Sequence, residues 1–281
     1  MLTVQFQYQH PAYDQIRSAL EVKLLDPSPN LIADWDRFDT NIHLHFPSSD
    51  RNWRYWQFEQ ACFNQSLAIA ESSCQLLEDS LSENVFPAGY FKNAGIIATF
   101  HFASYRIIGK WLAASSIKFV LVVSGEVKDS QETIFHEQIA GCLQDSSAFY
   151  ILNANDPRVI LKIRTAVRRG YMVLIYVDGN VGGSGRKETI TLFHSKIAVR
   201  SGACDIARML GVPLYPIYAN RGEGTLMFNL ADPLDGCDKG AQDVNAGTAG
   251  MHSLYGAIKD SMLAAPYLWE NWFHLDEFAV H

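Results

Sequence analysis

The sequence contains no run of about 18 or more uncharged apolar residues, the length that a helix needs to cross a bilayer. Its N-terminal stretch lacks the basic and apolar regions of a signal peptide, so nothing there marks the chain for export. We therefore expect a cytoplasmic protein. Charged residues make up only 19% of the chain and hydrophobic residues 48%, a balance that excludes a disordered, highly charged chain.

The five cysteines are an odd number, widely spaced, and none forms a Cys-x-x-Cys motif. This pattern indicates neither a disulfide framework nor a zinc knuckle, and we expect reduced thiols. His43 and His45 alternate on one face of a predicted strand, but the sequence positions no third metal ligand beside them. Two partly exposed histidines are therefore favoured over a metal site.

Motifs for nucleotide binding are also missing. A glycine-rich stretch at residues 178–187 follows a predicted strand, but its Arg186-Lys187 pair is followed by β-like residues rather than by Ser or Thr opening a helix. This excludes a P-loop, and no dinucleotide fingerprint runs into a helix. Neither Ser124 nor Ser184 lies in the Gly-x-Ser-x-Gly pattern of a nucleophile elbow.

The net charge of -7 argues against general nucleic-acid binding, yet the charge is unevenly distributed. Residues 158–200 carry nine basic side chains against two acidic ones. One interpretation is a solvated helix face followed by a loop. The other is a basic rim for an anionic ligand, such as a phosphopantetheine carrier or a coenzyme A phosphate.

The length of 281 residues favours one large domain, or one domain with an N-terminal extension. Residues 1–85 are predicted to form that extension, with strand-like alternation at 4–8 and 42–46 and a long amphipathic helix over 56–81. Residues 86–281 are predicted to form an α/β core on which the extension packs.

Strands and helices alternate along this core, a pattern typical of a mainly parallel sheet flanked by helices. The predicted strands are 95–100, 119–123, 149–152, 171–177 and 213–219. The predicted helices are 104–112, 134–143, 157–169, 202–210 and 251–264. The fold class is therefore α/β.

His101 stands where the first core strand ends and a helix begins. In open α/β sheets the ligand crevice lies beyond the carboxyl ends of the strands, so a histidine there is placed to act as a base. A lone histidine is more often structural, and position alone leaves both interpretations open.

Five sequence blocks, in order over about residues 90–275, resemble the lipid A biosynthesis acyltransferases, a branch of the lysophospholipid acyltransferase superfamily. The first, Phe100-His101-Phe102-Ala103-Ser104-Tyr105-Arg106, is similar to the family's His-Phe-Gly-Asn-Trp-Glu motif. The others are Arg169–Asp178 (Gly, strand, Asp), Phe193–Ala198, Ala207–Pro216 and Pro266–Phe273, the last resembling the closing Pro-x-x-Tyr-x-Trp-x-x-x-Arg-Phe signature.

The resemblance implies a lysophospholipid-acyltransferase-like fold in which the histidine takes a proton from an acceptor hydroxyl that attacks an acyl thioester. In the family, an acid five residues after the histidine orients the imidazole, and here that position is Arg106. A guanidinium cannot do the work of a carboxylate. Either Asp178 or Glu126 replaces the acid, or Arg106 has become a ligand-binding residue, or catalysis is lost.

Two further departures are the missing arginine of the closing signature and the missing N-terminal membrane anchor of the lipid A enzymes. The mixed residues 1–50 precede the 56–81 helix instead, for which an ordinary amphipathic core helix is favoured over contact with a membrane surface. A soluble acceptor therefore fits this chain better than lipid A.

On this basis the sequence predicts a soluble acyltransferase that moves an acyl or aminoacyl group from a thioester to a hydroxyl or amine of a small acceptor. His101 is the predicted base, Asp178 the supporting acid, and the region of Ser104 a holder of the acceptor or the oxyanion. Arg106 is expected to bind an anionic part of either substrate. The residues expected to face the phosphopantetheine or an acidic carrier are Arg164, Arg168, Arg186 and Lys187.

No metal and no tightly bound cofactor is expected, since coenzyme A or a carrier protein serves as donor substrate. The expected partners are an acyl or peptidyl carrier protein and a small-molecule acceptor, with no nucleic acid and at most peripheral membrane contact. Two alternatives remain open. One is a non-catalytic relative that binds an acyl chain or a carrier protein, and the other is a thioesterase-like hydrolase with water as the acceptor.

Overall fold

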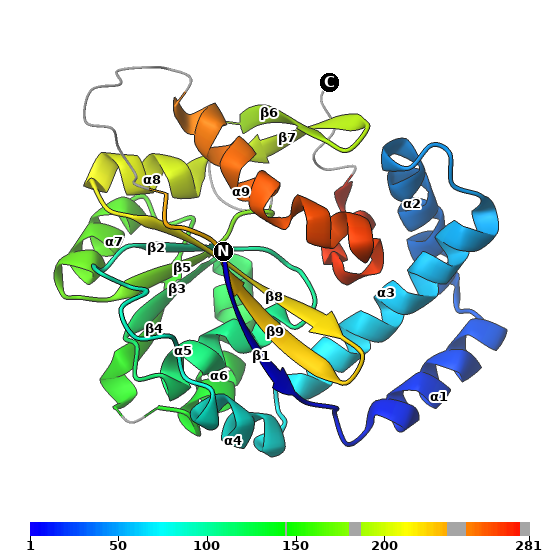
Figure 1. Cartoon of the computed structure of the whole chain (residues 1–281), viewed down its shortest axis with the longest axis horizontal. Helices are drawn as coiled ribbons and strands as arrows, with labels where there is room; N and C mark the ends of the chain where they lie inside the picture. Colours follow the sequence, from blue (N-terminus) through cyan, green and yellow to red (C-terminus); the bar gives the residue numbers. More distant parts are fainter. Residues whose placement is uncertain (144, 180–186, 235–245, 276–281) are drawn as a thin grey trace.

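The computed structural model of this chain describes residues 1–143, 145–179, 187–234 and 246–275 (Figure 1). A seven-stranded sheet in the order β1-β9-β8-β2-β5-β3-β4 forms its centre. The strands are β1 (Leu2–Gln7), β2 (Ile96–Thr99), β3 (Phe119–Val123), β4 (Phe149–Asn153), β5 (Met172–Tyr176), β8 (Leu214–Gly222) and β9 (Thr225–Leu230). A separate hairpin pairs β6 (Lys187–Leu192) with β7 (Ser195–Arg200) and contacts the last helix.

Strands β8, β2, β5, β3 and β4 are mutually parallel, whereas β8–β9 and β9–β1 are antiparallel. The mostly parallel α/β sheet expected from the sequence is therefore confirmed. All five predicted core strands are present, with ends shifted by a few residues, and the predicted strand at 4–8 is β1. Strand β1 lies at the sheet edge, so residues 1–85 contribute a strand as well as helices.

Helices cover both faces of the sheet (Figure 1). The helices are α1 (Tyr13–Leu25), α2 (Pro29–His45), α3 (Arg51–Glu71), α4 (Gln75–Glu83), α5 (Ile108–Ala114), α6 (Gly125–Ala140), α7 (Val159–Arg168), α8 (Gly202–Leu210) and α9 (Ala246–Ala264). Short 3-10 turns are η1 (Tyr105–Ile107), η2 (Ser146–Ala148), η3 (Pro266–Leu268) and η4 (Glu270–Phe273). None of the described helices is long and apolar enough to cross a membrane.

Alternate residues of the parallel strands enter two separate hydrophobic cores, because successive side chains of a strand point to opposite faces. Phe119 and Leu121 of β3 pack into the core that contains residues of α4, α5 and α6. Val120 packs into the other core, with residues of α7, α8 and α9. The sheet thus separates an α5–α6 side from an α7–α8 side.

Two elements of the N-terminal segment differ from the sequence prediction. Residues 42–46 were predicted as a strand, but Ile42 to His45 form the last turn of α2, where Phe38, Ile42 and His45 are buried at helical spacing. The Ser28 side chain caps this helix, and Pro29 suits its first position. The single helix predicted over 56–81 is two helices, α3 and α4.

The break between α3 and α4 has a local cause. The Ser72 and Ser73 hydroxyls donate to the carbonyls of Ile69 and Ala70, and so compete with continuation of the helix. Cys74 then has an extended backbone before α4 begins. This bend allows α4 to pack against α5 while α3 contacts the C-terminal turn η3.

Candidate functional site

His101 and Asp178 follow two neighbouring parallel strands. His101 lies two residues beyond the end of β2, Asp178 lies two residues beyond the end of β5, and Thr99 pairs with Tyr176 across the two strands. The His101 Nδ1 lies 2.8 Å from Asp178 Oδ1. A carboxylate only accepts hydrogen bonds, so this contact places the proton on Nδ1 and leaves Nε2 as the basic nitrogen.

The Asp178 carboxylate is fully buried, and its second oxygen is also held. Asp178 Oδ2 accepts the His101 backbone N–H at 2.9 Å and the Trp269 indole N–H at 2.8 Å. The Asn271 side-chain amide donates to the backbone carbonyl of Asp178. These contacts compensate for burial of the charge and fix the direction in which the carboxylate faces the imidazole.

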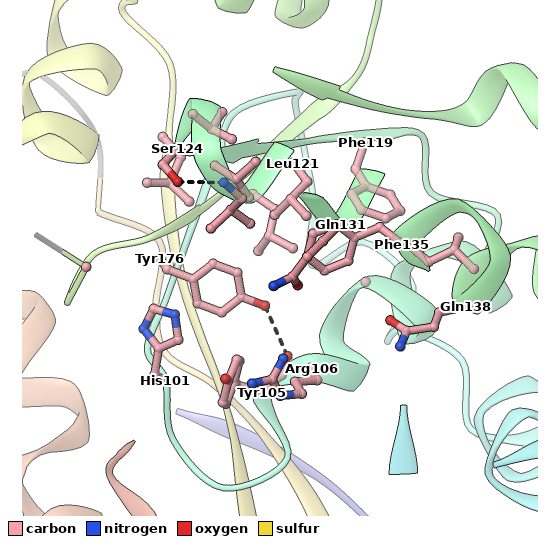
Figure 2. A pocket seen from close by; sticks show the side chains of 18 of the residues that line it. His101, Tyr105, Arg106, Phe119, Leu121, Ser124, Gln131, Phe135, Gln138 and Tyr176 are labelled. Carbon is pink, nitrogen blue, oxygen red and sulfur yellow. Dashed lines mark hydrogen bonds between the residues drawn. The ribbon is translucent and has the colours of Figure 1, made fainter. Parts of the chain in front are cut away.

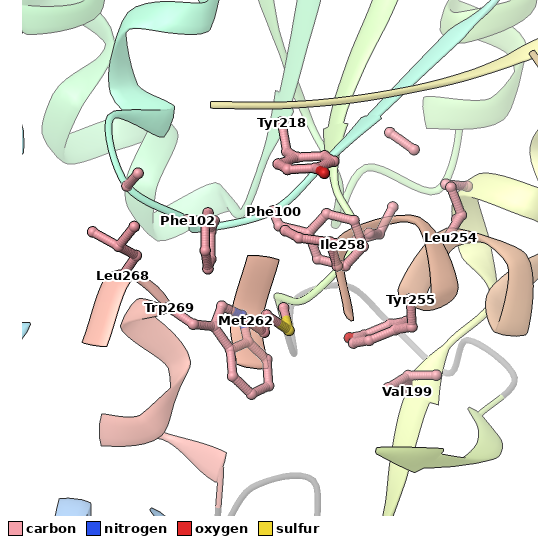
Figure 3. Close-up of a cluster of buried hydrophobic side chains, with 14 of the residues drawn as sticks. Phe100, Phe102, Val199, Tyr218, Leu254, Tyr255, Ile258, Met262, Leu268 and Trp269 are labelled. Atoms are coloured by element: carbon pink, nitrogen blue, oxygen red, sulfur yellow. The ribbon is translucent and has the colours of Figure 1, made fainter. Parts of the chain in front are cut away.

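The loop that carries His101 is held from the far end of the sequence. Ala103 N–H donates to the Leu268 carbonyl at 2.7 Å, and Glu270 N–H donates to the His101 carbonyl at 2.9 Å. On either side of the histidine, Phe100 and Phe102 point into the buried cluster beside α9 (Figure 3). The C-terminal turns thus position the histidine and also orient its carboxylate partner.

Aromatic rings surround the imidazole (Figure 2). His101 stacks on Tyr176, with ring centroids 4.6 Å apart, and meets the edge of Tyr105 at 4.8 Å. The Tyr176 hydroxyl donates to the Tyr105 carbonyl at 3.2 Å. The histidine side chain remains 27% exposed, which leaves part of the imidazole open to a substrate.

Opposing effects act on the pKa of His101. Burial lowers it, whereas the negative charge and hydrogen bond of Asp178 and the charge of Glu270 raise it. Arg106 lowers it to a smaller extent, and the net pKa lies above its usual value of 6.5. The carboxylates therefore prevail over burial and favour proton acceptance by this imidazole.

A cavity of about 290 Å³ opens beside His101 on the α5–α6 side of the sheet. We call it the first cavity. Much of its lining is apolar, and its polar lining includes His101, Arg106, Lys110, Gln131 and Gln138; all of these except Lys110 are labelled in Figure 2. The residues that line the apolar part include Gly109, Phe119, Leu121, Val127, Phe135, Ile139 and Leu174. Such a cavity suits an aliphatic chain whose polar end lies at the histidine.

Arg106 lies at the first cavity. Its guanidinium is 3.9 Å from the Glu270 carboxylate and 5.0 Å from the centroid of the Tyr105 ring. The Arg106 Nε is buried and has no hydrogen-bond partner among the described residues. The structure therefore places a cation with an unused donor beside the imidazole.

Ser104 does not line the first cavity. Its hydroxyl is fully buried and accepts from Arg221 Nη2 at 2.5 Å. Arg221 also contacts Glu71 Oε2 at 2.6 Å and Asn64 Oδ1 at 2.8 Å. Ser104 therefore joins the histidine loop to an internal ion pair between α3 and β8, and the structure gives its hydroxyl no access to the cavity.

The remaining predicted site residues lie outside the histidine's surroundings. Glu126 is exposed in the first turn of α6, so Asp178 and not Glu126 contacts the histidine. Arg164 and Arg168 are exposed on α7, and Lys187 is exposed at the start of β6. Arg186 lies outside the described residues.

Sequence reasoning did not assign roles to Trp269, Glu270 or Asn271. The sequence block that contains them was noted, but their contacts with Asp178 span about ninety residues of sequence, and no local pattern predicts which side chain meets Asp178.

His45 was predicted to lie on a strand. It is buried at the end of α2, its Nδ1 lies 2.9 Å from the Leu192 carbonyl, and burial lowers its pKa. Within the described residues, no three metal-ligating side chains come together.

Comparison with known proteins adds no assignment. Neither the protein-family models nor the curated proteins that were searched contain a match to this chain. The site geometry must therefore carry the functional conclusion.

Arg221 pairs with the buried carboxylate of Glu71, so removing the arginine should measurably lower the stability of the protein. Replacing Arg221 with Met leaves Glu71, only 2% exposed, without its cation, and we expect the free energy of unfolding to fall by about 3 kcal/mol. Urea denaturation measures this change. Lys128→Met, at the partly exposed surface pair with Glu132, is the control and is expected to cost less than about 0.5 kcal/mol.

A second substitution distinguishes the cost of leaving the Glu71 charge unpaired from the cost of losing the packing of the arginine side chain. Adding Glu71→Leu to Arg221→Met removes the uncompensated charge, and most of the lost stability should return. Equal stability of the single and double variants would contradict a paired buried charge.

The charges near His101 predict opposite shifts of its titration. Glu270→Gln removes a charge that raises the pKa, so the midpoint of the His101 ring titration should move to lower pH. Arg106→Gln removes a charge that lowers the pKa, so the midpoint should move to higher pH. Proton NMR of the imidazole Cε1–H measures both. Shifts in the same direction would show that the two charges do not act on His101 as the geometry indicates.

Proposed function

We propose that this protein is an acyltransferase that moves an acyl or aminoacyl group from a thioester to a hydroxyl or amine of a small acceptor. The observation that supports it most is the His101–Asp178 pair at the mouth of an apolar cavity. The pair supplies an oriented base, and the cavity supplies a place for the chain of the acyl group.

The reaction follows from the protonation state of the histidine. His101 Nε2 takes the proton of the acceptor O–H or N–H as the acceptor oxygen or nitrogen bonds to the thioester carbonyl carbon. The C–S bond of the resulting tetrahedral species then breaks, and His101 returns the proton to the departing sulfur. The products are an ester or amide and a free thiol, and Asp178 stabilises the imidazolium between the two steps.

Arg106 is proposed to bind a negative part of the donor or the developing oxyanion. Its buried, unpartnered Nε and its position at the cavity support this role. The donor is proposed to be coenzyme A or a carrier protein. The basic residues of α7 that were predicted to face it are exposed, but α7 lies on the face of the sheet opposite the first cavity, so they do not support this part of the proposal.

Two local features support the resemblance to the lipid A acyltransferases. The third residue of the family's histidine motif is glycine, and the corresponding Ala103 has a backbone φ of +50°, a conformation that favours glycine. In addition, the histidine motif and the closing signature lie side by side, with Phe102 bridged to Trp269. Asp178 supplies the carboxylate that Arg106 cannot.

The test is thioester turnover. The purified protein is incubated with acyl and aminoacyl thioesters of coenzyme A and of carrier proteins, together with pooled small-molecule acceptors, and mass spectrometry follows the products. His101→Ala should lower the rate at least about 100-fold with little effect on donor binding. Ester or amide formation supports the transferase. Free acid alone would indicate a hydrolase, and binding without turnover would indicate a non-catalytic protein.

Gly109 provides a test of where the acyl chain lies. A Cβ at this position would meet Phe119 and Ile139 at ordinary contact distances of 3.4 and 3.5 Å, so a larger side chain extends into the first cavity. Gly109→Leu should shift the preferred acyl chain to a shorter one by several methylenes, each worth about a fourfold change in relative kcat/KM. Competition between thioesters of different chain length measures this preference. An unchanged preference would place the chain elsewhere.

A further inference from the structure

A second apolar cavity, of about 230 Å³, lies on the opposite face of the sheet, between the sheet and helices α7 and α8. Ile160 and Ile163 of α7 and Ala203 and Ile206 of α8 line it. Among the described lining residues, Arg200 is the only charged one. This second cavity is not part of the site derived above.

The two cavities meet at the carboxyl edge of the sheet. Five residues line both of them, all at or just beyond the ends of strands: Val122, Ala154, Ile175, Tyr176 and Gly179. Beside these shared residues the lining of the two cavities differs in the sense expected from strand alternation. Leu174 lines only the first cavity, and Val177 lines only the second.

The catalytic pair lies at this junction. Tyr176 lines both cavities and stacks on His101, and Asp178 stands between Val177 and Gly179 in the sequence. A molecule in the second cavity would therefore reach the sheet edge beside the imidazole from the face opposite the first cavity.

We propose that the second cavity binds the apolar body of the acyl acceptor. This inference rests on the proposed transferase activity and adds to it a substrate class, an alcohol or amine carried on an aliphatic chain. A bimolecular transfer needs two binding places that meet at the base, one for the acyl chain and one for the nucleophile. The two cavities on opposite faces, joined at the stacked Tyr176, provide that arrangement.

The aliphatic character of the lining determines what the acceptor can be. Apart from Tyr176 and Arg200, the described side chains that line the second cavity are isoleucine, valine and alanine. They offer no hydrogen bonds to a sugar or another polyhydroxylated acceptor, most of whose polar groups would be left unpaired there. Each methylene of an alkyl acceptor that enters the second cavity should instead lower its KM by about fourfold.

The first experiment uses primary n-alkanols and n-alkylamines of increasing length as acceptors, at a saturating concentration of one acyl thioester. Ile160→Trp fills the second cavity, and Leu161→Trp is the matched control, because Leu161 is 54% exposed on the same helix and does not line the cavity. We expect Ile160→Trp to raise the acceptor KM of the longer compounds at least tenfold. The thioester KM should change less than twofold, and Leu161→Trp should resemble the unaltered protein.

Two kinetic results would overturn the proposal. If Ile160→Trp changes the preferred acyl chain length and leaves the acceptor KM unchanged, the second cavity holds the donor. If it changes neither, the cavity holds no substrate. Gly109→Leu is the reciprocal variant, and it should alter the preference for acyl chain length while leaving the acceptor KM within twofold.

A binding measurement separates this proposal from the proposed function. Saturation-transfer NMR with 1-octanol, in the absence of thioester, should show binding to the unaltered protein and to Leu161→Trp, and at least tenfold weaker binding to Ile160→Trp. Turnover without this selective loss contradicts the acceptor site alone. Selective loss without turnover of any thioester contradicts the transferase, and with it the acceptor role, but leaves an apolar ligand site.

Discussion

The interaction on which the site depends is the buried carboxylate of Asp178 with the Nδ1–H of His101. A fully buried charge is costly unless several donors surround it, and Asp178 accepts from the His101 ring, the His101 backbone and the Trp269 indole. The carboxylate and its donors together come from three parts of the chain: the ends of two neighbouring strands and the C-terminal turns. The geometry of this site therefore forms only when the sheet and the C-terminal segment have come together.

The same convergence brings a carboxylate to His101 although the residue five positions after it is Arg106. Because β2 and β5 are parallel neighbours, residues that follow them meet at one edge, and a carboxylate from β5 can serve a histidine from β2. The position five residues after the histidine is occupied by Arg106, which lies at the first cavity and pairs with Glu270. Both carboxylates raise the pKa of His101, and the arginine only partly opposes them.

The sequence predicted the parts of the fold that depend on local pattern. The five core strands and helix α8 were predicted because β-prone runs and helical spacing alternate there. His101 and Asp178 were predicted as site residues because each follows the end of a predicted strand. The 42–46 strand was wrong because Ile42, Leu44 and Phe46 alternate with histidines, whereas the burial of this segment follows helical spacing from Phe38 to Ile42 and His45.

Contacts between segments that are far apart in the chain could not be predicted from the sequence. The burial of Ser104 against Arg221 depends on how α3 and β8 meet, and the partner of Trp269 depends on the path of the last turns. The second cavity likewise arises from the packing of α7 and α8 over the sheet edge. None of these follows from residue spacing, since each joins elements that approach one another only in the folded chain.

The tautomer of His101 tests the central claim most directly, because every proposed step requires Nδ1 to donate to Asp178 and Nε2 to be free. Nitrogen-15 NMR of the imidazole, recorded above the pKa of the ring, distinguishes the two neutral forms. We expect a protonated Nδ1 and an unprotonated Nε2, and we expect Asp178→Asn to abolish this preference. A neutral ring protonated on Nε2 would contradict the assignment of His101 as the base.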